Sequence, residues 1–380
     1  MKTTAIICEY NPFHKGHSLQ INLIKEQGSA VVCIMSGNFV QRGQPAVFGK
    51  FDRAKAAILE GADLVVELPY PYCCSAAEHF CFGGVALANS LGVVDELCFG
   101  SECGNIDKLK EASDRLRSTE FTEAVKTARA DRQNKEKPYA NLRSLIYEKL
   151  YGEKLSDMPN DILAVEYITA LKKIKSNILP VTYQRKEGFS ATESRKLLSE
   201  KNDLSMIPEK ARGVFENAVR YDIKNLEKEI RFFYTFADTK QLSLCYGMTN
   251  GIAERIKKAA NESMGLDDLI DRIKGKSYTN AKIRRCIING MLGAHTEDLK
   301  MPPMYTQVLA CNDVGRKLVK QIQKCGNIEI ITKPSHYKNL DGLAKKQAEL
   351  SFAADKLQTL AADTKQPSNY FVKQTPYIQK

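Results

Sequence analysis

The sequence lacks the features of a membrane-spanning or secreted protein. Its 380 residues contain no uninterrupted apolar stretch of about 18 residues, the length that a membrane-spanning helix needs. The N-terminus enters an apolar, strand-like segment directly, without the basic region and apolar core of a signal peptide. There is also no internal repeat and no low-complexity run. We therefore expect a cytoplasmic protein without a membrane segment.

Cysteine pairs with the spacing of a redox or zinc motif are also missing. The chain has 11 cysteines, scattered and often within apolar runs, but no Cys-x-x-Cys pair. Reduced, buried thiols fit this pattern better than disulfides. A zinc site formed by His79, Cys81, Cys98 and Cys103 is the alternative, but their spacing matches no common zinc site. We therefore predict no metal site in the protein itself.

The composition is that of an ordinary globular protein, with 43% hydrophobic and 27% charged residues. A chain of this length is expected to form two domains. We place the boundary near residue 203, which divides the chain into residues 1–203 and 204–380.

Positive charge is concentrated in the second half of the chain. The net charge is +11, yet residues 1–200 contain 26 Lys and Arg against 25 Asp and Glu. Residues 201–380 contain 30 against 20. A basic half beside a nearly neutral half indicates a polyanion partner such as RNA. Simple solubility is the alternative, because charge alone does not identify a partner.

The most informative stretch is the beginning of the chain. Residues 4–8 form an apolar run with the length of a buried, parallel strand. Asn11-Pro12 ends this strand, and Leu19, Leu23 and the neighbouring Ile21 and Ile24 fit the inward face of a helix that follows. A strand, a tight turn and a helix N-terminus form an anion site, because free backbone N–H groups and the helix dipole point at the turn.

Two histidines add a further property to this turn. His14 and His17 are three residues apart at the predicted helix start, and Gly16 between them allows close approach of the backbone. Both imidazoles can then face one ligand and donate hydrogen bonds to phosphate oxygens as charge develops in a displacement. The alternative is a pair of surface histidines on a turn. The position directly after the first strand favours the functional interpretation.

The string His14-Lys15-Gly16-His17 after a first strand resembles the nucleotidyltransferase superfamily, which has a Rossmann-like fold. A longer set of residues is more specific. It comprises the string Glu9-Tyr10-Asn11-Pro12-Phe13-His14, together with Met35-Ser36-Gly37-Asn38-Phe39 and Gln41-Arg42-Gly43. This set is similar to the bacterial tRNA(Met) cytidine acetate ligase family. The resemblance is strong over about the first hundred residues, returns near Pro159 and Arg185, and is fainter in the C-terminal half.

Strand-like and helix-like segments alternate through the first half of the chain. The predicted strands are residues 4–8, 30–35, 63–68, 93–99 and 178–183. Alternation of this kind implies right-handed crossovers and a parallel sheet. We predict an α/β fold, with a Rossmann-like doubly wound parallel sheet of the nucleotidyltransferase type and a mostly helical, basic α+β C-terminal domain. Ligands of such sheets bind beyond the carboxyl ends of the strands, which places residues 11–17, 36–42, 69–75 and 100–102 at one edge.

A second motif follows the last of these strands. Arg185 and Lys186 precede a turn in which Ser190 or Thr192 can cap a helix. Capping alone is one explanation of these hydroxyls. The string Ser-Ala-Thr-x-x-Arg also resembles the second signature of the nucleotidyltransferases, where the loop holds the triphosphate. The family carries a longer segment between the basic position and this motif, so the short connection here, around Gly188, puts a lid function of that loop in doubt.

The family resemblance implies a two-step reaction, in which ATP and acetate give acetyl-adenylate and the acetyl group then passes to N4 of the wobble cytidine of elongator tRNA(Met). It implies His14 and His17 as catalytic residues at the α-phosphate. Mg²⁺ is expected with ATP, although no carboxylate pair in the sequence marks its site. The residues that the resemblance implies for ATP binding are Ile7, Cys8, Glu9, Tyr10, Asn11, Pro12, Phe13, His14, Lys15, Gly16, His17, Ser18, Leu19, Gln20, Gly100, Asn160, Arg185, Lys186, Ser190 and Thr192.

Within this set, the resemblance assigns different parts of the nucleotide to different residues. Arg185, Lys186, Ser190 and Thr192 are expected to hold the β- and γ-phosphates. Gly100 and Asn160 match family positions that contact the nucleotide, and a side chain at residue 100 is expected to obstruct the adenosine.

A basic cluster in the second half is the candidate tRNA-binding surface. Two predicted helices, residues 266–273 and 282–291, are joined by a basic turn that contains Tyr278. Cations beside a tyrosine suit contacts with phosphates and stacking on a base. A solvated helical face is the alternative interpretation. The basic residues of this candidate site are Lys274, Lys276, Lys282, Arg284 and Arg285.

The last part of the sequence predicts a smaller strand–helix–strand unit over residues 307–332. The tail from residue 368 to residue 380 is polar and aromatic, and we expect it to be loosely held. The sequence carries no signal for a particular oligomeric state.

Two other classes of function remain open from the sequence. One is a small-molecule adenylyltransferase of the pantetheine-phosphate or nicotinamide-mononucleotide type, which shares both motifs but is usually much shorter. The other is a non-catalytic RNA-binding protein that keeps a nucleotide pocket as a sensor. The intact histidines argue against the second class, and the basic second half is unexplained by the first.

Overall fold

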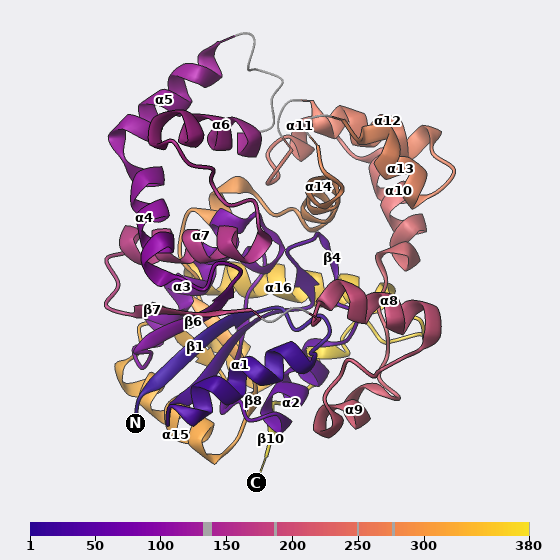
Figure 1. Cartoon of the computed structure of the whole chain (residues 1–380). Helices are drawn as coiled ribbons and strands as arrows, with labels where there is room; N and C mark the ends of the chain where they lie inside the picture. The colour runs from indigo at the N-terminus through magenta and orange to yellow at the C-terminus, as the bar shows by residue number, and fades with distance from the viewer. Residues whose placement is uncertain (132–138, 186–187, 249–250, 276–277, 380) are drawn as a thin grey trace.

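The structure, a computed structural model, describes residues 1–131, 139–185, 188–248, 251–275 and 278–379. One large sheet crosses the molecule, with helices on both of its faces (Figure 1). Its order is β10-β8-β5-β2-β1-β6-β7, and β9 pairs with β8. The bounds of these strands are β1 Thr3–Cys8, β2 Ala30–Ser36, β5 Leu64–Leu68, β6 Glu96–Ser101, β7 Leu179–Gln184, β8 Tyr305–Cys311, β9 Glu329–Ile331 and β10 Tyr377–Ile378.

The part of the sheet from β5 to β7 is parallel and doubly wound. From β1, the chain passes through α1 (Lys15–Glu26) to β2 and through α2 (Lys50–Leu59) to β5. It then returns through α3 (Ala77–Ser90) to β6, on the other side of β1, and reaches β7 after α7 (Pro159–Lys173). Right-handed crossovers therefore place α1 and α2 on one face and α3 and α7 on the other (Figure 1). The predicted fold class is confirmed. The predicted inward face of α1 is right for Ile21 and Ile24, which are buried, but wrong for Leu19 and Leu23, which are exposed and border a cavity instead.

Every residue of β1, β2 and β5 is buried, because helices cover both faces of the sheet. The register sets the strand ends side by side. Cys8 of β1 pairs with Met35 of β2, and Ser36 pairs with Leu68 of β5. The turns that carry the predicted motifs therefore leave the sheet at one edge, as the sequence predicts.

Two groups of helices extend beyond the sheet, and they lie on opposite sides of the upper part of Figure 1. The first comprises α4 (Ile106–Arg117), α5 (Thr119–Ala130) and α6 (Tyr139–Tyr151). The second comprises α10 (Glu227–Phe236), α11 (Thr239–Leu242), α12 (Ile252–Glu262), α13 (Leu266–Ile273) and α14 (Asn280–Leu292). The remaining helices are α8 (Ala191–Lys201), α9 (Glu209–Phe215), α15 (Asp313–Cys325) and α16 (Gly342–Leu360).

The strand–helix–strand unit near the C-terminus is present but does not stand apart. The expected elements are β8, α15 and β9, but β8 pairs antiparallel with β5 and so extends the main sheet. The tail was expected to be loosely held, and this expectation is wrong. Strand β10 pairs with β8, and the Phe371 side chain, only 2% exposed, packs beside Tyr221.

The boundary near residue 203 stays a prediction. Strands from both sides of it share the sheet, and one hydrophobic core contains Val65 of β5 and Leu309 of β8.

All 11 cysteines are free thiols, and all but Cys103 and Cys325 are buried. Within the described residues, no helix is both long enough and apolar enough to cross a membrane.

Candidate nucleotide site

The first turn of α1 is built around the two predicted histidines. His14 is the N-cap of the helix, and its Nδ1 accepts a hydrogen bond of 3.1 Å from the N–H of Gly16. Nδ1 of His17 accepts one of 3.2 Å from the N–H of His14. The two side chains thus satisfy helix N–H groups that have no partner within the helix.

These bonds fix the tautomer of both imidazoles. Since Nδ1 of each ring accepts, the proton of the neutral ring resides on Nε2. The rings of His14 and His17 stack with centroids 3.7 Å apart, so their Nε2–H groups can act on one ligand. Burial, with the charges of Arg185 and Arg195, lowers the pKa of His14 to about 4. Burial, with His14 and Arg185, lowers the pKa of His17 well below its usual value, so both rings are neutral donors at pH 7.

The histidines border two adjoining cavities at the carboxyl edge of the sheet. One has a volume of about 180 Å³, and the other, between α1 and the end of β7, has about 100 Å³. His17, Gln20, Tyr183 and Arg185 line both of them. The predicted residues that line the first cavity are Ile7, Cys8, Glu9, Tyr10, Asn11, His17, Gln20, Gly100, Asn160 and Arg185. Those that line the second are His14, Gly16, His17, Leu19, Gln20 and Arg185.

Arg185 is held in place by the start of α7. Its guanidinium donates a 3.0 Å hydrogen bond to Oδ1 of Asn160, whose amide group donates to Oε1 of Glu102 at 2.6 Å. Gly100 lies beside this network, and a Cβ at this position would lie 2.8 Å from Cγ of Arg185 and 3.0 Å from the Tyr183 ring. The absence of a side chain at residue 100 therefore keeps room for Arg185 at the cavity.

The second motif forms the start of α8. Ser190 caps the helix, since its Oγ accepts a 3.0 Å hydrogen bond from the N–H of Glu193. Oγ1 of Thr192 accepts hydrogen bonds from Arg195 at 3.2 Å and from Arg42 at 3.3 Å. Arg195 also donates to the carbonyl oxygen of Asn11 at 2.6 Å, which joins α8 to the first turn. Ser190 and Thr192 line neither cavity themselves, although Ala191 between them lines the larger one.

Arg42 and Arg195 were not named among the candidate site residues. Both stand within motifs that the sequence displays, Gln41-Arg42-Gly43 and Ser-Ala-Thr-x-x-Arg. For Arg195, the signal that would have identified it is a cation within the same short motif as Ser190 and Thr192, two predicted phosphate ligands. Their guanidinium groups meet at the hydroxyl of Thr192, so they supply positive charge beside the histidines.

A fully buried arginine joins the ends of the first two strands. The Arg53 guanidinium donates to carbonyl oxygens of Glu9 and Ser36, and also to those of Gly37 and Phe48. Glu9 follows β1, Ser36 and Gly37 lie at the end of β2, and Phe48 precedes α2. Planar, five-donor geometry makes arginine suited to holding several carbonyls at once. Arg53 therefore fixes the backbone behind the cavity, a role that no local pattern in the sequence indicates.

The connection between β2 and α2 contains a short hairpin, β3 (Phe39–Val40) and β4 (Gln44–Pro45). The N–H of Gln41 at its tip donates to Oε1 of Glu9 at 2.7 Å. On the other side, α14 contacts the same hairpin. Arg285 donates to the carbonyl oxygen of Gln41 at 2.8 Å, and Arg284 donates to Oε1 of Gln44 at 3.2 Å. The hairpin therefore links the cavity to the basic part of the chain.

The candidate tRNA-binding residues are thus placed in different surroundings. Lys274 is exposed, whereas Arg284 and Arg285 are partly covered by the hairpin. Nζ of Lys282 lies 4.6 Å from the ring centroid of Tyr278. The ring of Tyr278 is only 7% exposed, so the expectation that it offers a stacking face to a base is wrong.

Four predicted residues of the opening segment line neither cavity. Phe13 is buried in the core, Pro12 is buried before α1, Lys15 is exposed, and Ser18 donates to a carboxylate oxygen of Glu60. Lys186 and Lys276 lie outside the described residues.

Carboxylate clusters do not mark a metal position in this part of the molecule. Among the described residues, no group of three or more His, Cys, Asp or Glu side chains has a geometry that could hold a metal ion. Mg²⁺ commonly binds through one or two carboxylates with substrate phosphates and water. The side chains at this edge of the sheet therefore suit a Mg²⁺ ion that binds together with ATP better than one that the protein holds alone.

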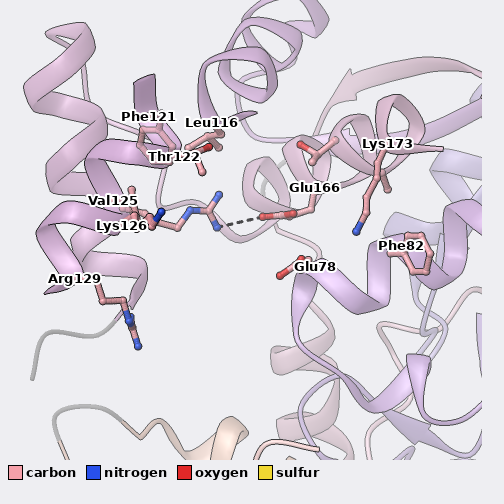
Figure 2. Close-up of a pocket in the computed structure, with 13 residues that line it drawn as sticks. Glu78, Phe82, Leu116, Phe121, Thr122, Val125, Lys126, Arg129, Glu166 and Lys173 are labelled. Carbon is pink, nitrogen blue, oxygen red and sulfur yellow. Dashed lines mark hydrogen bonds and ion pairs between the residues drawn. The ribbon is translucent and has the colours of Figure 1, made fainter. Parts of the chain in front are cut away.

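A larger cavity of about 430 Å³ lies away from the motif residues, between α3, α5 and α7 (Figure 2). An ion pair between Arg143 and Glu166 lines it, and Lys173 lies over the ring of Phe82. None of the residues predicted to bind ATP lines this cavity. Its size alone does not associate it with the motif chemistry.

The fold and the histidine pair define a nucleotidyltransferase. In agreement, the family described as HIGH nucleotidyl transferase matches the chain over residues 1–371. The tRNA(Met) cytidine acetate ligase of Clostridium perfringens is 35% identical over 372 residues, covering 89% of this chain and 91% of that protein. The ligase of Acetivibrio thermocellus is 30% identical over 405 residues, covering 95% of each chain. The chain belongs to the tRNA(Met) cytidine acetate ligase family.

Solved structures agree with this relationship. Thermotoga maritima TmcAL, in a crystal structure with bound alpha-thio ATP, superposes with a TM-score of 0.92 at 26% sequence identity. The match covers 100% of this chain and 99% of that chain. The apo form of the same protein gives a TM-score of 0.91. The similarity therefore extends over the helical second half as well as the sheet.

Proposed function

We propose that this protein activates acetate with ATP and transfers the acetyl group to N4 of the wobble cytidine of elongator tRNA(Met). The observation that carries the proposal is the convergence of two neutral histidine Nε2–H donors and Arg185 on the smaller of the two adjoining cavities at the carboxyl edge of the sheet. Family membership supports the choice of reaction. The cytoplasm is the proposed location, because both ATP and tRNA are present there.

The first step is the formation of acetyl-adenylate. An acetate oxygen attacks the α-phosphorus of ATP, the bond to the β-phosphate oxygen breaks, and pyrophosphate leaves. His14 and His17 are proposed to donate hydrogen bonds to the α-phosphate oxygens, where negative charge develops. Arg185 and the start of α8, with Thr192 and its two arginines, are proposed to hold the β- and γ-phosphates. Mg²⁺, entering with ATP, supplies charge neutralisation at the phosphates.

In the second step, the cytidine amine takes the acetyl group from the adenylate, and AMP leaves. An exocyclic cytidine amine is a poor nucleophile, so a high-energy acyl donor suits this acceptor. The tRNA body is proposed to lie on the basic part of residues 204–380, with Lys274 and Lys282 among its phosphate contacts.

Acetate-dependent exchange of labelled pyrophosphate into ATP tests the first step. We expect exchange that requires acetate and is lost in His14→Ala, while His336→Ala, which alters a histidine outside both cavities, exchanges normally. Labelled acetate should then appear in tRNA(Met) digested to nucleosides, as N4-acetylcytidine. Exchange with a nucleotide or pantetheine product, but none with acetate, would instead identify a small-molecule adenylyltransferase.

A further inference from the structure

Among the described residues that line the larger cavity of the nucleotide site, Glu9 is the one carboxylate. It directly follows β1, and its backbone carbonyl is held by Arg53. A carboxylate beside a polyphosphate is electrostatically unfavourable, so phosphate binding does not explain why an acid stands here. The proposed transfer step, in contrast, has to remove a proton from an amine.

The two carboxylate oxygens of Glu9 have different surroundings. Oε1 accepts the 2.7 Å hydrogen bond from the N–H of Gln41. Oε2 accepts no hydrogen bond from any residue in the described ranges. One oxygen thus holds the carboxylate in position, and the other remains available in the cavity.

The charged groups around Glu9 keep it a usable base. Burial raises the pKa of Glu9 above its ordinary value, while the guanidinium groups of Arg195, Arg42 and Arg53 limit the rise. The carboxylate of Glu9 is therefore more basic than that of an exposed glutamate. His14 and His17 cannot compete for the proton, because Nδ1 of each is occupied and Nε2 already carries a proton.

Glu9 also lies on the side of the cavity that faces the basic part of the chain. Gln41 joins the two sides, since its N–H bonds to Glu9 and its carbonyl oxygen accepts from Arg285 of α14. An RNA held by the second half would approach the cavity past this hairpin. Glu9 therefore lies on the side of the cavity from which an acceptor amine would arrive.

We propose that Glu9 is the general base of the transfer step, an inference that rests on the function proposed above. The N4 amine of cytidine attacks the acetyl carbonyl carbon, and Oε2 of Glu9 takes a proton from N4. The new C–N bond forms as the bond from the acetyl carbon to the phosphate oxygen breaks, and AMP leaves with that electron pair. Solvent later takes the proton from Glu9 and restores the carboxylate.

The test compares the two half-reactions in Glu9→Gln. The amide oxygen can still accept from the N–H of Gln41, so the variant keeps the anchor and loses the base. Glu60→Gln is the matched control, because Glu60 bonds to Ser18 of α1 but lines neither cavity. Pyrophosphate exchange reports the adenylation step. Single-turnover transfer from supplied acetyl-adenylate to tRNA(Met) reports the second step without requiring the first.

We expect Glu9→Gln to slow transfer by about 100-fold, the usual size of a general-base contribution, and to lower the ratio of transfer to exchange at least tenfold. Glu60→Gln should leave this ratio unchanged. Equal losses in both half-reactions, or exchange restored by added Mg²⁺, would overturn the proposal and assign Glu9 to nucleotide or magnesium binding. If the wild type neither exchanges with acetate nor acetylates tRNA from the supplied adenylate, the proposed function itself fails.

Discussion

Arg285 on α14 donates a 2.8 Å hydrogen bond to the carbonyl oxygen of Gln41, although the two residues are 244 positions apart in the chain. Gln41 in turn bonds through its N–H to Glu9 in the cavity. A residue that the sequence assigns to tRNA binding therefore also supports the nucleotide site. Removal of its guanidinium should therefore slow acetate-dependent exchange even in the absence of RNA.

Arg285→Ala and Lys274→Ala are expected to separate these two roles. Loss of the Arg285 guanidinium leaves the carbonyl of Gln41 without this donor, so acetate-dependent exchange should fall several-fold in the absence of tRNA. Lys274 is exposed and lines neither cavity, so its substitution should leave exchange unchanged and weaken tRNA binding. Exchange rates and filter-binding affinities of both variants check this. Normal exchange in Arg285→Ala would contradict the supporting role.

Gly43→Ala should detach the hairpin from α14. Gly43 has a φ of +74°, and an added Cβ would lie 2.3 Å from the backbone nitrogen of Arg285. Gly28 is a matched control, because its φ is +73° but a Cβ there would meet nothing within 4 Å. Both substitutions carry a strain of about 1–2 kcal/mol for a left-handed residue.

The clash should make Gly43→Ala less stable than Gly28→Ala by a further 2 kcal/mol or so, since backbone atoms have to move apart. Urea denaturation measures the difference, and pyrophosphate exchange measures the loss of activity that should accompany it. Equal stability and equal exchange in the two variants would show that the hairpin does not depend on close contact with α14.

Stability should depend on pH through the buried histidines. The pKa of His14 is lowered to about 4, so the unfolded chain, with an ordinary histidine pKa of about 6.5, binds more protons between these values. The free energy of unfolding is then highest above pH 6.5. It falls as the pH drops towards 4, by at most about 1.4 kcal/mol per pH unit for one histidine.

His14→Asn is the informative variant for this prediction, because asparagine is a good N-cap but does not titrate. Unfolding free energies at pH 5 and pH 7 should differ less in His14→Asn than in the wild type. An identical pH dependence in the two proteins would mean that His14 is not the titrating group.

Lys50→Met should be strongly destabilising. Nζ of Lys50 bonds to Glu67 of β5 at 2.9 Å and to Asp355 of α16 at 2.8 Å, and all three side chains are buried. Removal of the cation leaves two carboxylates facing each other, at a cost of about 3–5 kcal/mol. Lys55→Met on the same helix should cost far less, because Lys55 is only partly buried and its Nζ lies 5.2 Å from the centroid of the Tyr377 ring.

The loss in Lys50→Met should shrink at lower pH. Burial already raises the pKa values of Glu67 and Asp355, and removal of Lys50 raises them further. The folded state of the variant then binds more protons than the unfolded state, so its stability relative to the wild type improves as the pH falls. Urea titrations at pH 8 and pH 5.5 give this comparison, and a constant difference would contradict it.

The parallel part of the fold could be predicted because its signals are local. Apolar runs, the Asn11-Pro12 break and helical periodicity mark β1 and α1 within a few residues. The antiparallel pairing of β8 with β5 has no such signal, since Val65 and Ala310 are far apart in the chain. For the same reason, the sequence did not show that β10 holds the tail.

The candidate site could likewise be predicted only in part. His14 and His17 were predictable because the motif that contains them lies at the predicted start of a helix. Arg53 was not, because it acts on the carbonyl oxygens of two different turns, which only the folded sheet brings together. Burial of Tyr278 likewise depends on packing between helices, which the residue type alone does not indicate.

The pairing of β10 with β8 makes completion of the sheet depend on segments that are far apart in the chain. Tyr377 and Ile378 pair with β8, and β8 in turn covers the edge of β5. Without residues 305–378, the edge of β5 would present unpaired N–H and C=O groups, which can pair with strands of other chains. Partly folded molecules in which this segment is detached should therefore be prone to aggregation.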